Sequence, residues 1–198
     1  MASYHPTLWR TCRTLANDKR LRCLIAVLTE PKLTVGEIAA RTGIAENRAG
    51  ECLRALQARG LIEARRHSRW VRYVPVPDPL VPSARPILSA LRAALIKAHL
   101  DPTDAFRVLT GFTHPRRLVI LRALSVAGPL SIEELARATD IPPRALYRHL
   151  DKLLARGFVA QQGDGWLLAA KPGPLARALL ELAVRGAPVT DTPPEVCQ

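Results

Sequence analysis

The chain has 198 residues, of which 48% are hydrophobic. This composition supports one ordinary domain or two small ones with a hydrophobic core, and it excludes a disordered chain. The formal charge of +12 indicates a polyanionic partner or an anionic surface. Residues 1–74 hold 14 lysines and arginines against 6 acids, so this half is expected to dominate long-range attraction.

The N-terminal stretch MASYHPTLWRTCRTL lacks the apolar run of a signal peptide, and no apolar run is long enough to span a bilayer. The four cysteines form no C-x-x-C pair and fit a reducing compartment. We therefore expect a cytoplasmic protein with no metal or other cofactor. Cys12, Cys23 and Cys52 are expected to be buried free thiols, and a redox pair of Cys12 and Cys23 is the less favoured alternative.

The first predicted elements are a helix over residues 6–16 and an apolar helix spelled KRLRCLIAVL. A short helix follows, opened by a capping box over residues 34–37, and a turn at Gly43 leads into a longer fourth helix. A strand–turn–strand segment around Trp70 comes next. The last helix is predicted over 86–99, because its apolar residues recur at helical spacing.

The same pattern returns 97 residues later without a gap, where PLSIEELARATDI matches KLTVGEIAARTGI. A helix over 102–112 and a capping box over 131–134 precede a fourth helix that begins after Asp140. Trp166 aligns with Trp70 if the second copy loses one residue. Both tryptophans are expected to anchor their hairpins on the helices.

The repeat predicts a mainly α (α+β) protein with two tandem modules. The first module covers residues 1–100 and includes the helix over 86–99. The second covers 101–186 and ends with a helix over 174–185. Residues 187–198 are predicted to be a flexible tail.

A short capped helix, a tight turn and a longer helix with a polar outer face are typical of a helix-turn-helix. In that motif the start of the second helix meets base edges in the major groove, where arginine pairs bidentately with guanine. The alternative is a charged face that is merely solvated. In the second copy the predicted core stripe is Leu146, Leu150, Leu153 and Leu154, and the candidate DNA contacts are Arg144, Tyr147 and Arg148.

The first copy distributes its charge differently. Its hairpin, EARRHSRWVRY, is rich in arginines that suit phosphates, whereas the second hairpin, AQQGDGWLL, has no cation before Lys171. His67 in the first hairpin is a better nucleic-acid candidate than His149. The first-copy candidates are Asn47, Arg48 and Glu51 on the fourth helix and Arg65, Arg66 and Arg69 in the hairpin.

The segments THPRRLVILRAL and LSIEELARATDIPPRALYRHLDKLLARGFV resemble winged-helix repressors of the ArsR type, and the first copy resembles them less closely. The resemblance implies winged helix-turn-helix domains that pair through their first and last helices. In one chain this implies an intramolecular pseudo-dimer. The helices 1–16 and 86–99 of the first module would pack on the helices 102–112 and 174–185 of the second. The third helices lack the C-x-C pair of metal-responsive members, so no metal sensing is expected.

The sequence thus predicts a non-enzymatic, sequence-specific regulator of transcription with two unequal modules, expected to be a repressor, that binds double-stranded DNA in the cytoplasm at the nucleoid. No nucleophile elbow, phosphate-binding loop or zinc-protease motif occurs in it. The alternative is a protein-interaction or architectural chromosome-associated protein without sequence specificity. A further homodimer of the fused chain remains open.

Overall fold

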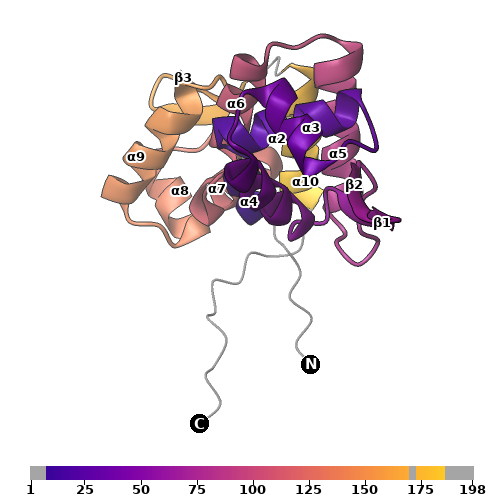
Figure 1. Cartoon of the computed structure of the whole chain (residues 1–198). Helices are drawn as coiled ribbons and strands as arrows, with labels where there is room; N and C mark the ends of the chain where they lie inside the picture. The colour runs from indigo at the N-terminus through magenta and orange to yellow at the C-terminus, as the bar shows by residue number, and fades with distance from the viewer. Residues whose placement is uncertain (1–7, 170–172, 186–198) are drawn as a thin grey trace.

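The computed structural model describes residues 8–169 and 173–185, and these residues repeat one order of elements (Figure 1). We call the first half module one; its elements are α1 (Leu8–Leu15), α2 (Asp18–Thr29), α3 (Val35–Thr42), α4 (Glu46–Gln57), β1 (Glu63–His67), β2 (Trp70–Val74), α5 (Ala84–Arg92) and the π-helix η1 (Ala93–Lys97). Module two consists of α6 (Pro102–Gly111), α7 (Pro115–Ala127), α8 (Ile132–Thr139), α9 (Pro143–Leu154), β3 (Val159–Gln162), β4 (Gly165–Leu168) and α10 (Pro174–Arg185). The mainly helical fold with two small antiparallel sheets confirms the predicted fold class.

Both predicted capping boxes are present and begin α3 and α8, the helices that precede α4 and α9. The hydroxyl groups of Thr34 and Ser131 accept from the amides of Glu37 and Glu134, whose carboxylates accept from the cap amides in return. These hydrogen bonds hold the pKa of both carboxyl groups below the usual range. The boxes therefore start α3 and α8 at equivalent positions.

The turns that end α3 and α8 use the left-handed backbone conformation. Gly43 has φ 65° and Asp140 has φ 53°. Glycine adopts this region freely, and aspartate is one of the few other residues that tolerate it. Each turn sets the start of the following longer helix, as the sequence predicts.

The two hairpins differ in length, since β1 and β2 have five residues each and β3 and β4 have four. A β-bridge ties each hairpin to the residues before the capping box: Leu33 pairs with Tyr73, and Leu130 pairs with Trp166. Because Leu33 and Leu130 occupy equivalent places, Tyr73 is the structural counterpart of Trp166. The predicted equivalence of Trp70 with Trp166 is therefore wrong.

The tryptophans also differ in their surroundings. Trp166 is 4% exposed and packs into the core, which confirms its predicted role as an anchor. Trp70 is 51% exposed, so the same prediction is wrong for it. In the first hairpin, Tyr73 is the residue that packs against the core. The strands continue three residues beyond Tyr73 to the tip of the hairpin.

The first and last helices of the two modules pack on each other. Helix α1 contacts α6, and α5 contacts α10. Buried residues from both modules form one continuous hydrophobic cluster. Each of these four helices contributes a fully buried leucine, whose burial stabilises the fold by roughly 1.5–3 kcal/mol: Leu15, Leu91, Leu109 and Leu179.

Two arginines hold the first helix of each module, one from the second helix and one from just beyond the end of α4 or α9. In module one, Arg59 Nε donates to Thr14 Oγ1 at 3.2 Å, and Arg20 Nη1 donates to the Thr14 carbonyl at 3.4 Å. Module two repeats the arrangement with shorter bonds. Its partners are Arg156 Nε to Thr110 Oγ1 (2.5 Å) and Arg117 Nη1 to the Thr110 carbonyl (2.6 Å).

The helix predicted over 86–99 begins earlier and ends differently. Helix α5 starts at Ala84, and from Ala93 to Lys97 the chain continues as a π-helix. The amide of Ala98 donates to the carbonyl of Ala93, five residues before it, which widens the last turn. This turn keeps Ala94 and Leu95 buried. No periodicity of 3.6 residues predicts such a change.

The predicted tail, 187–198, and Cys197 lie outside the described residues, as do the first residues of the helix predicted over 6–16. Among the helices that the structure describes, none is both long and apolar enough to cross a lipid bilayer.

Candidate nucleic-acid interface

The outer face of α9 presents three side chains to solvent. Arg144, Tyr147 and Arg148 are exposed, and Tyr147 is 51% exposed. Pro143 occupies the first helical turn, where its missing N–H leaves no bond unmade. Within the described residues, no hydrogen bond or ion pair holds Arg144 or Arg148. These side chains are positioned by the helix and remain available to an external acceptor.

The inner face of α9 differs from the predicted stripe at its end. Leu146, Leu150 and Leu153 are completely buried, as predicted, but Leu154 is 44% exposed. Each residue turns the helix by about 100°, so Leu154 points about 80° away from Leu146. His149 lies within about 60° of Leu146 and takes the buried position instead.

The burial of His149, which is 6% exposed, is inconsistent with a contact to nucleic acid. Its ring lies 4.5 Å, centroid to centroid, from that of His114, the N-cap residue of α7. Burial first, and then the charges of His114, Arg117, Arg116 and Arg148, lower the pKa of His149 to about 4. The imidazole is therefore neutral near pH 7 and packs inside module two.

On α4 the three candidate residues are exposed, but two of them bind each other. Arg48 Nη1 forms an ion pair with Glu51 Oε2, and this contact raises the pKa of Arg48. Asn47 lies beside them without a hydrogen bond to any other described side chain. The helix contains two arginines and two glutamates, so its formal charge is zero. On α9, by contrast, two arginines and a lysine face one aspartate.

The first hairpin concentrates cationic groups. Arg65, Arg66 and Arg69 are exposed, and Arg65 Nη2 lies 2.9 Å from Glu63 Oε2. Arg72 is held more firmly, because its Nη1 donates to the carbonyl of Lys32 at 2.7 Å. A hollow of about 390 Å³ opens beside these groups. Its lining residues are Lys32, Arg65, Arg66, His67, Arg72 and Val74.

The hollow includes a residue that the sequence analysis did not single out. Lys32 lies immediately before Leu33, and the bridge of Leu33 to Tyr73 brings it against the hairpin. The amide of Lys32 also donates to the Tyr73 carbonyl at 2.8 Å. Its sequence position gives no sign of this cluster without the pairing of the strands.

The second hairpin contains no basic residue between 159 and 168, and its turn holds Asp164. Lys171, the next cation, lies outside the described residues. The two modules therefore present their positive charge from different elements. In the view of Figure 1, α9 and the β1–β2 hairpin lie at opposite sides of the molecule.

The described cysteines are free and buried: Cys12, Cys23 and Cys52. Burial raises the pKa of Cys23 to about 12, with a smaller contribution from Cys52. Its thiol neighbour is Cys52 on α4 and not Cys12, which weighs against the alternative redox pair. Within residues 8–169 and 173–185, no group of three or more histidines, cysteines and acids could hold a metal ion.

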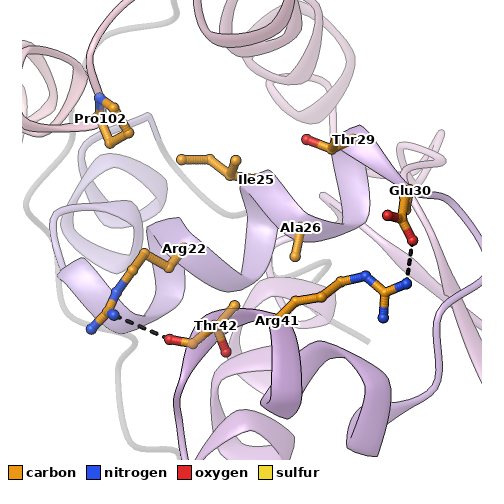
Figure 2. Close-up of a pocket in the computed structure, with 8 residues that line it drawn as sticks. All are labelled: Arg22, Ile25, Ala26, Thr29, Glu30, Arg41, Thr42 and Pro102. Carbon is orange, nitrogen blue, oxygen red and sulfur yellow. Dashed lines mark hydrogen bonds and ion pairs between the residues drawn. The ribbon is translucent and has the colours of Figure 1, made fainter.

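A second hollow, of about 400 Å³, lies against α2 and α3, with Pro102 from the start of α6 at its edge (Figure 2). Its two arginines are used within the chain. Arg22 Nη1 donates to the Thr42 carbonyl at 3.1 Å, and Arg41 Nη2 donates to Glu30 at 2.5 Å. Because these contacts satisfy the charged groups at the hollow, we assign it no ligand.

Two family models match different parts of the chain. The model described as "Sugar-specific transcriptional regulator TrmB" matches residues 18–78, from α2 to just beyond β2. The model described as "Helix-turn-helix domain" matches residues 112–162, from the end of α6 through β3. No curated protein matches the chain significantly. Together, the two matches support a DNA-binding transcriptional regulator with helix-turn-helix domains.

Proposed function

We propose that the chain is a sequence-specific regulator of transcription that binds double-stranded DNA at an asymmetric site and acts as a repressor. The observation that carries this proposal is the exposed pair Arg144 and Arg148 at the start of α9, neither of which is held by another described group. Arginine in this place suits bidentate recognition of guanine in the major groove. Tyr147 lies between them on the same outer face.

Module one contributes most of the phosphate contacts in this proposal. Arg65, Arg66 and Arg69 face solvent on its hairpin, where guanidinium groups can bind the backbone without reading sequence. Asn47, Arg48 and Glu51 provide a second, weaker reading surface on α4, since Arg48 must leave Glu51 before it binds a base.

We further infer that the chain is a fused pseudo-dimer of ArsR type, with modules over 1–100 and 101–186, at work on the nucleoid in the cytoplasm. The contacts of α1 with α6 and of α5 with α10 support this arrangement. They involve the helices through which the resemblance implies pairing. Because one chain contains both helices that we propose to contact bases, α4 and α9, a single copy is expected to occupy the whole DNA site.

The first experiment measures fluorescence anisotropy of a labelled duplex from the chain's own upstream region, at near-physiological salt. The full chain is titrated with and without excess unrelated DNA. Binding that survives the competitor is expected for a specific regulator. Binding that the competitor abolishes contradicts sequence specificity and favours an architectural protein, and absence of binding at low salt contradicts DNA binding altogether.

Two further measurements use the same duplex. Transcription in vitro from that upstream region should fall as the protein is added; a rise would contradict repression. Sedimentation of the complex should give one chain per duplex, whereas two chains would show that the fused chains pair again.

A further inference from the structure

The tip of the first hairpin exposes large apolar side chains. Trp70 is 51% exposed, and Val71, the next residue of β2, is 45% exposed on the other face of the hairpin. Arg69, in the adjoining turn, places its guanidinium 5.3 Å from the centre of the indole. Trp70 does not anchor the first hairpin to the core, because Tyr73 occupies the position that Trp166 has in module two. The indole therefore lies on an extension that module two does not have.

The strand register places the indole on the cationic face of the hairpin. His67 pairs with Trp70, and Arg65 pairs with Arg72, two residues further along each strand. Directly paired residues share a face, and so do residues two apart along a strand. The aromatic pair thus stands at the tip, and the guanidinium pair stands roughly 6–7 Å behind it.

The hollow lies behind this tip. Lys32, Arg65 and Arg72 all line it, and Arg72 is already fixed there by the Lys32 carbonyl. Arg65 is oriented by an exposed pair with Glu63, a contact that a phosphate can replace at small cost. A flat apolar ring and an adjoining anion site match the two chemical parts of a nucleotide, its base and its phosphate.

We propose that Trp70 inserts against a base of the bound duplex and opens one base step, while Arg65 and Arg72 hold the neighbouring phosphate. This inference rests on the proposed binding of DNA. Apolar side chains that enter a base step unstack it and kink the duplex. Since the tip of the second hairpin is the turn around Gly163 and Asp164, the kink occurs only in the part of the site that module one binds.

The test follows the emission of the protein and the shape of the DNA together. The full chain is titrated with the upstream duplex labelled at its two ends with an energy-transfer pair. Wild type should show quenching of the tryptophan emission, to which Trp9 and Trp166 also contribute, and a shorter end-to-end distance at saturation. Trp70→Ala should lose both signals and bind roughly fivefold or more weakly. Trp70→Phe should retain the bend, because a phenyl ring also stacks.

Val126→Ala is the matched control, because Val126 is an exposed apolar residue on α7, away from the hairpin. It should bind and bend DNA like wild type. If wild type binds but neither bends the duplex nor loses indole emission, or if Trp70→Ala bends it equally, the inference is overturned and the proposed function stands. If wild type does not bind the duplex at all, both fail. Trp70→Phe should also lose the emission change, which assigns the quenching to Trp70 even if Trp70→Ala does not fold.

Discussion

Module one and module two share their order of elements, but they place exposed positive charge on different ones. In module one, the hairpin bears Arg65, Arg66 and Arg69, while α4 has no net charge. In module two, α9 has an excess of cations, while the second hairpin has none between residues 159 and 168. The same scaffold thus tolerates opposite charge patterns, because the exposed positions of the helix and hairpin contribute little to the core.

The buried positions of α4 and α9 differ as well. Cys52 on α4 and His149 on α9 lie 97 residues apart and are both buried. Cys52 adjoins Cys23, whereas the His149 ring packs against that of His114 at an interplanar angle of 43°. The lowered pKa of His149 predicts that module two loses stability as the pH falls toward 4.

The largest expected effect follows from removal of the proposed base contacts on α9. Replacement of Arg144 and Arg148 together by alanine should weaken binding to the specific site by roughly 30-fold to 25,000-fold, because each of the two bidentate contacts contributes about 1–3 kcal/mol of discrimination. Binding to unrelated DNA should fall much less. Anisotropy titrations of the two duplexes measure the ratio. The double variant Arg107→Ala/Arg185→Ala removes the same charge from α6 and α10; if its site preference falls equally, α9 is not the reading helix.

Gly60 and Gly157, the last residues of the A-R-G segments in the two modules, should contribute differently to the free energy of unfolding. Gly60 and Gly157 both have positive φ, 67° and 73°. A Cβ at Gly60 would lie 2.9 Å from atoms of Asp78 and Val81, whereas none lies within 4 Å at Gly157. Gly60→Ala should therefore cost about 2–4 kcal/mol of unfolding free energy, and Gly157→Ala about 1–2 kcal/mol. Denaturant unfolding of the full chain measures both, and equal losses would contradict the close packing at Gly60.

The next prediction concerns the loss of stability at low pH, which should depend on His149 in module two. The pKa of His149 is about 4 in the fold and about 6.5 when unfolded, so its stabilising contribution is complete above pH 6.5 and is lost as the pH falls toward 4. Between pH 7.5 and pH 5 the loss should be roughly 2 kcal/mol. Melting curves should show that His149→Leu reduces this loss, while His67→Leu, at an exposed position, does not. A loss unchanged in His149→Leu would contradict the buried neutral imidazole.

The smallest expected effect concerns the hairpin of module one. Replacement of Arg65 and Arg66 by alanine should weaken binding to every duplex, roughly tenfold, and reduce the slope of log affinity against log salt by about 2. Anisotropy at several salt concentrations measures the slope. The variant Arg85→Ala/Arg92→Ala, exposed on α5, provides the charge-matched comparison. A selective loss at the specific site would show that this hairpin reads bases instead.

Much of the fold follows from local rules in the sequence. The capping boxes at Thr34 and Ser131, and the turns at Gly43 and Asp140, depend on interactions within a few residues, so the sequence predicts them correctly. The equivalence of the tryptophans fails because it depends on strand register, which the distant residues Leu33 and Leu130 determine.

The candidate site also has some features that short-range patterns predict and others that they do not. Exposure of Arg144, Tyr147 and Arg148 follows from helical periodicity alone. The pairing of Arg48 with Glu51 is a local contact that the helical spacing permits but does not require. The place of Lys32 beside the hairpin and the burial of His149 arise from packing between elements distant in the chain, and short-range patterns do not contain them.

The contacts of α1 with α6 and of α5 with α10 lie within one polypeptide, which changes how such a protein can evolve. In a homodimer every substitution appears twice, so both halves of the bound site must tolerate it at once. In this chain a substitution on α9 leaves α4 as it was. In the proposed regulator, each half of the DNA site can therefore change with its own module, one mutation at a time, while α4 and α9 stay in a ratio of one to one.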